Sequence, residues 1–535
     1  MSDSLFDPRI HVSVRLHAAA APDSIALVHG DQRISYGQLD AAACLYAAEL
    51  VERGVKPGTV VPLVLPRSPQ LVALQLAVLK CGAAYATVDL RWPASRQADI
   101  LQQIGSVLVV TGDDLLHRFT AYQPSAEDVQ SAAQRASFFE AADVYADAAA
   151  TVFFTSGTTG KPKGVVSPHQ AVTRLFGPGG LPGFGPGHAT PQAAALPWDM
   201  YAFELWGQLT SGGTTVLIDG DHLLPSTLRE LIRNAGVDTL WLTTSLFNLF
   251  VDEDIDCFAG LGHLYTGGEK LSPEHVRSFL FRHPGIPVRN GYGPAESCML
   301  TTTRLLAQAD CDVPGGVPLG AAVPGTSVHL LDAGDRICQP GELGEICIAG
   351  EGLAVGYLGN PELTSSRFPV IDIEGEAVRL YRTGDSGLVD AEGVLHFHGR
   401  NDRQVKISGH RVEMTEIEVT ANGLPGVRDS AVVALATAEG EVTGLAVFYT
   451  AHPDAPVQCE DADGQGNPDP LSVRGQLLEL LPGYLVPGVV RLLTRFPVTP
   501  NGKLDRQALQ QLARQPRRSP RRRPADLASD SGSSR

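Results

Sequence analysis

The sequence predicts an α/β protein with a large N-terminal domain and a small C-terminal domain. Strand-like and helix-like segments alternate through residues 34–283, a pattern typical of parallel sheets covered by helices. From about Val317 onward, glycine and proline separate short apolar segments, which indicates a small antiparallel barrel or sheet. A compact α+β segment follows, and we place the domain boundary near residues 401–402.

Local signals justify the elements of the first half. Segment 34–54 has apolar residues at helical spacing and ends at a glycine, and segment 68–82 is typical of a capped helix closed by glycine. Short apolar segments of the kind found in buried strands lie at 59–65 and 83–90. The same alternation predicts two further strands and two further helices, at 213–218 and 237–243 and at 225–236 and 272–283.

The second half of the sequence has a different pattern of residues. Short strands are expected at 327–332, 344–350 and 394–399, and the C-terminal part is expected to contain helices at 414–423 and 472–481 and strands at 429–437 and 444–450. Segment 452–470 is rich in Pro, Asp and Gly and is typical of a mobile loop. The arginine-rich tail is typical of a disordered, solvated segment. The predicted domains are 1–400, 401–512 and a tail at 513–535.

Composition and charge narrow the function classes. Of the 535 residues 43% are hydrophobic and 19% are charged, the balance of a globular protein with a sizeable core. A net charge of −17 argues against general nucleic-acid binding, which needs a basic surface. We find no secretory signal and no apolar stretch near the roughly 20 residues of a membrane span. Eight cysteines without CxxC spacing fit reduced thiols, so we expect a cytoplasmic protein.

The segment TSGTTGKPKG, at residues 155–164, combines hydroxyls, glycines and lysines directly after the apolar TVFF. It is not a Walker-type P-loop, because its glycines are too close together and a proline follows Lys161 where Ser or Thr is required. Its glycines can still turn backbone N–H groups toward an anion, and its hydroxyls and Lys163 can bind phosphate oxygens. Taken alone, the loop leaves a flexible surface turn as the alternative.

Eight motifs, in order along almost the whole chain, resemble those of the adenylate-forming superfamily, and specifically the amino-acid adenylation domains of nonribosomal peptide synthesis. They are ISYGQL, LKCGAAYATVD, TSGTTGKPKG, NGYGPAES, GELGEICIAGEGLAVGYLGNPELTSSRF, YRTGDSG, GRNDRQVKISGHRVEMTEIE and PVTPNGKLDR. The resemblance implies a large domain of two helix-covered, mostly parallel sheets and a small distorted β-barrel, followed by a small mobile α+β domain. It also implies ATP and Mg²⁺ as cofactors.

The resemblance assigns the phosphate and adenine contacts. The 155–164 loop would hold the β- and γ-phosphates. Asn290 would read the adenine edge and Tyr292 would stack beside the ring. Glu296 would bind the Mg²⁺ that bridges the phosphates, since magnesium favours few carboxylates plus phosphate oxygens. The family more often has threonine where Ala295 stands, so one hydroxyl contact is lost.

In YRTGDSG, Asp385 resembles the carboxylate that accepts both ribose hydroxyls. Arg400 resembles the arginine near the ribose and α-phosphate, with Phe397 close to the nucleotide. The full set of expected ATP contacts is Thr155, Ser156, Gly157, Thr158, Thr159, Gly160, Lys163, Gly268, Glu269, Asn290, Gly291, Tyr292, Gly293, Ala295, Asp385, Phe397 and Arg400.

Three residues of the C-terminal part are implied in catalysis and domain motion. Lys503, in TPNGKLDR, resembles the catalytic cation that binds the substrate carboxylate and the ATP oxygens. Asp402 resembles the hinge between the domains, although an ordinary linker aspartate is the alternative. The family uses two orientations of the small domain: one brings Lys503 into the site, and the other brings the KISGHR loop toward the cleft for thioester formation. Gly409 would leave a gap for the pantetheine arm.

The stretch LPWDMYAFELWG resembles the substrate-binding FDxS motif, with Trp198 and Tyr201 replacing its Phe and Ser. Asp199 would pair with the α-amino group of the substrate, because a buried carboxylate needs a cation. A lining without further charges disfavours acidic and basic amino acids, and Met200 would shorten the cavity, so we expect an alanine- to valine-like substrate. The other expected lining residues are Phe203, Leu242, Tyr265, Gly267, Gly291, Met299 and Leu300, with Lys503 closing the pocket.

The resemblance implies an enzyme that forms an aminoacyl-AMP and passes the aminoacyl group to a phosphopantetheine thiol. Few residues follow Lys503, so we expect a free-standing enzyme, and a separate carrier protein or coenzyme A as acceptor. We expect a monomer; the need for a small MbtH-like activator is left open. The alternatives are a D-alanine–carrier protein ligase, an acyl-CoA ligase, which should lack Asp199, and a catalytically silent scaffold, which the intact site residues disfavour.

Overall fold

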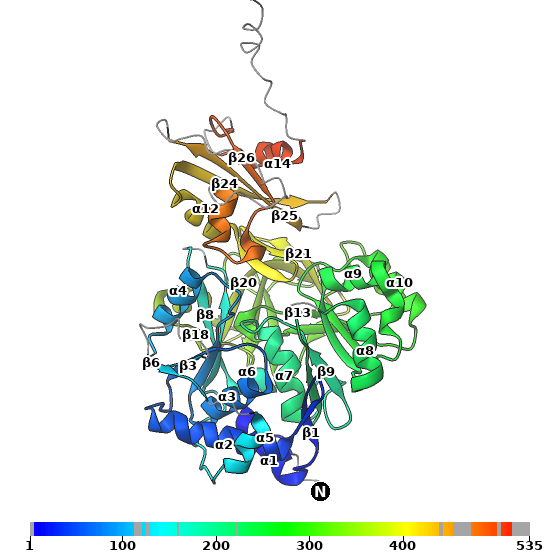
Figure 1. The fold of residues 1–535 in the computed structure, drawn as a ribbon. Coiled ribbons are helices and arrows are strands. Elements are labelled where there is room, and N and C mark those ends of the chain that lie inside the picture. The colour runs from blue at the N-terminus through cyan, green and yellow to red at the C-terminus, as the bar shows by residue number, and fades with distance from the viewer. Residues whose placement is uncertain are drawn as a thin grey trace, which may run out of the picture.

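The computed structural model describes residues 5–106, 108–111, 120–124, 128–157, 160–220, 223–437, 442–452, 472–499 and 504–515. In Figure 1 a large body carries the elements up to strand β21, and a smaller unit that contains β24, β25 and β26 sits on top of it. Several sheets with helices packed on them make a mixed α/β protein, so the predicted fold class is confirmed. The predicted domain limits stay predictions.

The first large sheet has seven strands in the order β18-β8-β7-β4-β3-β5-β6. Its centre is parallel, as the alternation of helices and strands predicted, whereas β7 and β8 form an antiparallel hairpin. That hairpin carries the TSGTTGKPKG segment. The strands are β3 (Val60–Val64), β4 (Ala84–Thr87), β5 (Leu108–Thr111), β6 (Thr120–Tyr122), β7 (Ala149–Thr155), β8 (Lys163–Pro168) and β18 (Gly356–Tyr357).

A second mostly parallel layer consists of two sheets, β2-β1-β10-β9 and β11-β12-β13-β14-β15. Strands β12 and β13 are paired in parallel, so their carboxyl ends lie at the same edge of the sheet. The motifs that follow these two strands therefore lie side by side. The strands are β1 (Ile25–His29), β2 (Gln32–Ser35), β9 (Ala189–Gln192), β10 (Thr214–Leu217), β11 (Thr239–Thr243), β12 (His263–Gly267), β13 (Val288–Tyr292), β14 (Thr302–Leu305) and β15 (Ala321–Ala322).

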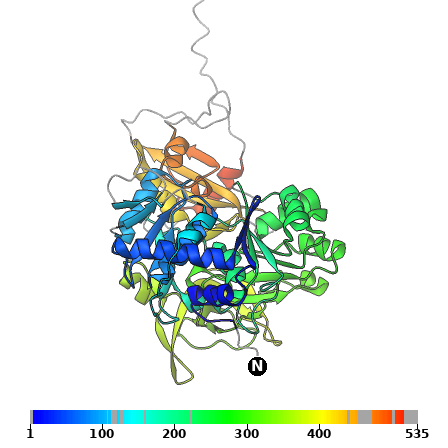
Figure 2. The ribbon, with the colours of Figure 1, turned by 60° about the horizontal axis from the view of Figure 1, so that its bottom comes forward.

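Helices cover these sheets, and the starts of two of them, α2 and α3, follow the expected capping rules. Ser35 and Gln38 form a capping box at α2, and Ser68 caps α3 directly before Pro69. Figure 2 shows the blue helices α1 and α2 on the face that comes forward. The helices are α1 (Ile10–Ala20), α2 (Tyr36–Glu52), α3 (Pro69–Lys80), α4 (Ala94–Ile104), α5 (Val129–Arg135), α6 (His169–Thr173), α7 (Asp199–Ser211), α8 (Pro225–Ala235), α9 (Thr244–Asp254), α10 (Pro273–Arg282) and α11 (Pro361–Arg367).

Helix α7 is the buried centre of the large body. Every residue from Met200 to Thr210 is buried, and Trp206 donates from Nε1 to the Tyr85 hydroxyl at 2.7 Å. Asp199 is the first residue of this helix and also the first residue of the expected substrate pocket. The packing of the helix therefore fixes the position of Asp199. The sequence pattern did not reveal this helix, because it is buried on all sides, Glu204 and Gln208 included, and so has no solvent-exposed polar face.

The glycine-rich part after Val317 is antiparallel, as predicted. It forms a sheet in the order β16-β17-β20-β19, with β21 paired to β20. The long strand β20 carries the YRTGDSG motif, and β21 ends at Arg400. The strands are β16 (Thr326–Leu331), β17 (Gly344–Gly350), β19 (Val370–Ile373), β20 (Glu376–Val389) and β21 (Leu395–Arg400).

The small C-terminal unit has cores of its own, formed only by residues beyond 404. Its described residues form a hairpin, a three-stranded sheet and three α-helices. Helix α14 reaches Arg514 and so includes the first two residues of the predicted tail; residues 516–535 of that tail and 453–470 of the predicted loop lie outside the described residues. The elements are β22 (Gln404–Ile407), β23 (His410–Glu413), α12 (Met414–Asn422), β24 (Val427–Ala436), β25 (Val442–Ala451), α13 (Val473–Leu478), β26 (Val489–Leu492) and α14 (Arg506–Arg514).

Two observations complete the fold. Within the described part of the chain, no helix has the length and apolar character needed to cross a membrane. The seven cysteines that lie in the described ranges are all free thiols.

Tyr36 gives a test of how α2 is tied to α7. Its buried hydroxyl donates to the Gly213 carbonyl at 2.8 Å. Tyr36→Phe leaves that carbonyl without this donor, so we expect the free energy of unfolding to fall by about 1–2 kcal/mol. Calorimetric unfolding of the whole chain measures the change. Tyr145→Phe, at a side chain that is 84% exposed, is the control and should change nothing; equal effects of the two substitutions would contradict the assignment.

Candidate active site

The glycine- and hydroxyl-rich loop connects β7 to β8, whose register pairs Thr155 with Lys163. Its tight course requires Gly157, because a Cβ there would lie 1.8 Å from the Lys161 carbonyl oxygen. Thr155 Oγ1 is buried and has no hydrogen-bond partner among the described residues, as expected of a group that meets a ligand oxygen. Two predicted contacts lie outside the described residues: Thr158 and Thr159.

A cavity of about 300 Å³ lies where β12 and β13 end. Tyr292 donates from its hydroxyl to Asp385 Oδ2 at 2.6 Å, and the Asn290 side chain donates to the Pro318 carbonyl at 2.8 Å. The cavity is large enough to admit a nucleoside, and its polar groups lie on different elements. The structure gathers eight of the predicted ATP contacts here: Gly268, Glu269, Asn290, Gly291, Tyr292, Asp385, Phe397 and Arg400.

A second cavity shares part of this wall and continues toward the loop and the expected substrate pocket. It is lined by Thr155 and Ser156 from the loop and by Asp199 and Met200 from α7. Gly293 and Ala295, the remaining predicted contacts on the β13 side, line it as well. The nucleotide, phosphate and substrate motifs therefore meet in one cleft.

Glu296 follows Ala295, which lines this cleft, and is completely buried. It accepts from the Tyr357 hydroxyl at 2.7 Å and from Arg411 Nη1 at 2.8 Å. Burial alone would raise the pKa of this carboxyl, but Arg411, Lys163 and the Tyr357 hydroxyl lower the pKa to about 2. Glu296 is therefore ionised at neutral pH, and it needs a cation at all times.

A magnesium ion fits this donor set. Within the described ranges no group of three or more His, Cys, Asp or Glu side chains could hold a metal ion by itself. Mg²⁺ commonly uses one or two carboxylates and takes its other ligands from phosphate oxygens and water. The ionised carboxylate of Glu296, close enough to Lys163 of the loop for that charge to lower its pKa, meets that requirement.

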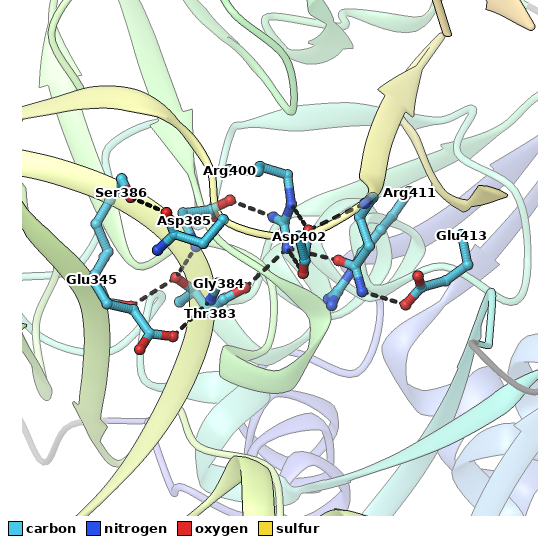
Figure 3. A network of polar contacts seen from close by, with 12 residues as sticks. Glu345, Thr383, Gly384, Asp385, Ser386, Arg400, Asp402, Arg411 and Glu413 are labelled. Carbon is cyan, nitrogen blue, oxygen red and sulfur yellow. Dashed lines mark hydrogen bonds and ion pairs between the residues drawn. The ribbon is translucent and has the colours of Figure 1, made fainter. Parts of the chain in front are cut away.

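The predicted hinge lies in a polar network (Figure 3). Arg400 pairs with Asp385 and forms a fork with Asp402, whose two oxygens accept at 2.8 and 2.9 Å. It also donates to the Gln404 side chain at 2.7 Å, and Arg411 donates to the same oxygen at 2.6 Å. Burial raises the pKa of Asp402, but its hydrogen bond and charge contact with Arg400 lower it overall. The expected ribose carboxylate and the hinge are thus joined through one guanidinium.

The β22–β23 hairpin of the small unit reaches into the cleft. Ser408 and Gly409 form its two-residue turn with φ of +50° and +81°, as type I′ hairpin turns require. The Gly409 N–H donates to Glu269 Oε1 at 2.9 Å, and a Cβ at Gly409 would lie 2.4 Å from Thr243. Of the two orientations that the resemblance implies, this is the one with the KISGHR loop at the cleft. Lys503 lies outside the described residues.

The expected substrate pocket begins at Asp199, which accepts from the Met299 N–H at 2.9 Å. Burial raises the pKa of the Asp199 carboxyl. Phe203 packs edge-to-face on Tyr265 with 5.5 Å between ring centroids. Gly267 is paired with Gly291 on the neighbouring strand, and the two backbones lie too close for a side chain, because a Cβ on Gly267 would lie 1.9 Å from the Gly291 oxygen.

The placement of Leu242 in the pocket is wrong by one residue. Leu242 packs in the core under α8, α9 and α10, whereas Trp241 faces the cleft and contacts Phe203 at 6.0 Å between centroids. Successive side chains of a strand point to opposite faces, so an error of one position moves a residue into another core. Trp241 replaces Leu242 as a lining residue and makes the pocket narrower.

Arg174 is a residue that motif reasoning missed. It is buried and donates to the carbonyls of Ser297 at 2.9 Å, Cys298 at 3.1 Å and Leu300 at 2.6 Å. Cys298 and Met299 both have positive φ, of 47° and 72°, which non-glycine residues rarely adopt. Burial lowers the pKa of Arg174 to about 10, so it remains charged at neutral pH. Arg174 therefore holds a strained turn that carries two pocket residues.

Comparisons with known proteins show which proteins this chain is similar to. A family model described as "AMP-binding enzyme" matches residues 14–358. Malpibaldin synthetase of Mortierella alpina is 36% identical over 92% of this chain, and tyrocidine synthase 3 of Brevibacillus parabrevis is 32% identical over 92%. The matches cover 9% and 7% of those relatives, so the chain spans less than a tenth of their length.

A solved structure is similar over nearly the full chain. Holo-PA1221, an NRPS protein containing adenylation and PCP domains bound to a vinylsulfonamide inhibitor, is 32% identical and has a TM-score of 0.82. The match covers 94% of this chain and 85% of that one. The chain belongs to the AMP-binding enzymes of the adenylate-forming superfamily. Within them it is an adenylation domain of the nonribosomal peptide synthetase type.

Arg174 gives a test of the pocket. Arg174→Met removes the donors that hold the turn at residues 297–300 but touches none of the nucleotide cavity. We expect the KM for the amino acid to rise about tenfold and the KM for ATP to change less than twofold. Arg174→Lys retains one donor group and should give an intermediate value. Equal increases of both KM values would show that Arg174 supports the fold and not the pocket.

Proposed function

We propose that this chain adenylates a small or medium apolar amino acid with ATP and transfers the aminoacyl group to a phosphopantetheine thiol. One observation carries the proposal. Asp199 brings a carboxylate to the wall of a cavity beside the apolar side chains of Met200, Trp241 and Met299. A carboxylate with a pKa raised by burial favours a ligand that brings a positive charge, and the α-ammonium group of an amino acid is such a ligand.

The first half-reaction follows from this placement. Asp199 would hold the substrate ammonium, so that a carboxylate oxygen of the amino acid attacks the α-phosphorus of ATP. The bond from that phosphorus to the pyrophosphate oxygen breaks, which leaves aminoacyl-AMP and pyrophosphate. Tyr292, Asp385 and Arg400 would hold the nucleoside, and Thr155 and Lys163 the departing phosphates. Mg²⁺ on Glu296 would neutralise charge on the phosphates.

Lys503 stays our proposal for the cation that joins the two anions. In the present orientation the β22–β23 hairpin lies at the cleft, which agrees with the second half-reaction. There the pantetheine thiolate would attack the carbonyl carbon of the adenylate and AMP would leave. Gly409, on the hairpin turn against Thr243, would border the path of the thiol. We propose Asp402 as the hinge on the basis of its fork with Arg400.

The lining supports a small or medium apolar substrate. With Trp241 in place of Leu242, the side-chain end of the pocket is formed by large apolar and aromatic groups, and none of them is charged. These features support an alanine- to valine-like side chain. Met200, Trp241, Met299 and Leu300 line the cavity, and Phe203 and Tyr265 belong to the same buried core.

The proposed partner is a carrier protein with a phosphopantetheine arm. Holo-PA1221 contains an adenylation and a PCP domain, which supports a carrier as acceptor. We propose that the carrier is a separate polypeptide and that the adenylating chain is a cytoplasmic monomer; the MbtH-like activator is an open requirement. D-Alanine–carrier protein ligase and acyl-CoA ligase activities are the alternatives, and only the second would dispense with Asp199.

Exchange of labelled pyrophosphate into ATP tests the proposal directly. We expect exchange with one or a few small apolar amino acids and none with fatty or aryl acids. Asp199→Asn should raise the KM for the amino acid at least tenfold, because the ammonium loses its charged partner. The raised pKa of Asp199 also predicts that this KM rises as the pH falls, since the protonated carboxyl cannot pair with the ammonium.

The controls separate the alternatives. Lys503→Ala should abolish exchange without changing the thermal unfolding of the chain, whereas exchange at the full rate would refute its catalytic role. No exchange with any amino acid would overturn the proposed function. Exchange driven by fatty or aryl acids alone would favour an acyl-CoA ligase instead.

A further inference from the structure

The small unit occupies the groups that the proposed function assigns to the phosphates. Glu416, on α12, accepts from the Gly157 N–H of the loop at 2.9 Å. Its other oxygen pairs with Arg96 of α4 at 2.7 Å, and both side chains are almost completely buried. A buried carboxylate with a backbone N–H and a guanidinium has the partners that a phosphate oxygen would have.

Glu413 binds a second group of the loop, the Lys163 ammonium. Its carboxylate pairs with Lys163 Nζ at 3.1 Å, and the side chains of the pair are 4% and 12% exposed. Its own N–H donates to Ser156 Oγ at 3.1 Å, and Ser156 in turn donates to the Arg411 carbonyl at 2.6 Å. The ammonium, one backbone N–H and one hydroxyl of the loop are therefore all bound by residues 411–416.

Arg411 takes the position of the cation. It lies 2.8 Å from Glu296, the carboxylate to which the proposed function assigns Mg²⁺. The guanidinium satisfies a carboxylate whose burial without a partner would be strongly unfavourable. Two carboxylates and one cation from the small unit thus bind the groups to which the proposed function assigns the phosphates and the metal ion.

We propose that Glu413, Glu416 and Arg411 form an internal counterpart of magnesium pyrophosphate. Seating the hairpin and α12 on the loop expels pyrophosphate, and pyrophosphate in solution expels the hairpin and α12. One set of donors cannot bind both at once, so each ligand shifts the equilibrium of the other. The inference rests on the proposed function, because it takes the loop to be the pyrophosphate site.

The competition between these three residues and pyrophosphate would favour the forward reaction. When the small unit is seated, the donors that would bind pyrophosphate are filled, so the aminoacyl-AMP is protected from reversal while the thiol attacks. When ATP or pyrophosphate is abundant, the same donors are taken and the small unit is released. No covalent step is involved; only the occupancy of Gly157, Lys163 and Glu296 changes.

Hydrogen exchange of the full chain, with magnesium and inorganic pyrophosphate as the probe, tests the inference. In the wild-type protein pyrophosphate should slow amide exchange in loop 155–164 and speed it in residues 404–422. Glu416→Gln weakens the seat, so the half-effective pyrophosphate concentration should fall about tenfold. Glu413→Gln is a second variant on the same surface and should act in the same direction.

Glu418→Gln is the matched control. Glu418 lies on the same helix, carries the same charge and pairs with Arg403 inside the small unit at 2.7 Å. It should leave the response to pyrophosphate unchanged, and thermal unfolding verifies that each variant is folded. An equal fall in all three variants would overturn the inference, because general loosening of the small unit would then explain it.

Two further outcomes separate the inference from the function beneath it. If pyrophosphate protects loop 155–164 but leaves residues 404–422 unchanged, the inference is overturned and the pyrophosphate site stands. If pyrophosphate protects the loop in none of the proteins, the proposed function falls and the inference falls with it.

Discussion

The ion pair between Glu296 and Arg411 is the contact on which the rest of the cleft depends. Glu296 has no exposure to solvent, and its pKa of about 2 keeps it charged at any physiological pH. A buried charge without a partner is strongly destabilising, so this position must always hold a cation. That cation is either Arg411, which is part of the small unit, or a metal ion that binds together with the ligand. The chemical state of the site and the position of the small unit are therefore coupled.

The same coupling continues through the hinge. Arg400 joins Asp385, the proposed ribose ligand, to Asp402, the proposed hinge, and shares the Gln404 side chain with Arg411. A change at Glu296 can reach the hinge through these contacts without a long mechanical path. Because each contact is charged and mostly buried, the network favours a few discrete arrangements over a continuum of positions.

The sequence was most informative where the chemistry is local. The loop, the glycine-rich turns and the β13 motif lie within short segments, and the structure brings them to one cleft. The helix and strand alternation predicted the layers for the same reason, since each signal lies within one element. The buried helix α7 escaped that reasoning because it has no solvent-exposed face.

Contacts between distant segments could not be predicted. Arg174 holds a turn more than 120 residues away, and Arg411 meets Glu296 across 115 residues, without any local pattern to signal either. The prediction that Leu242 lines the pocket was wrong for a different reason. The strand was predicted correctly, but which of its two faces borders the pocket depends on register, and Trp241 has the face that Leu242 was given.

The central claim is that Asp199 recognises the α-ammonium group of an amino acid. Calorimetric titration with two inert adenylate mimics tests it most directly, one an aminoacyl sulfamoyl adenosine and the other the same molecule without its amino group. The account predicts that the mimic with the amino group binds at least about a hundredfold more tightly, and that Asp199→Asn removes most of this difference. Equal affinities of the two mimics for the unmodified protein would contradict it.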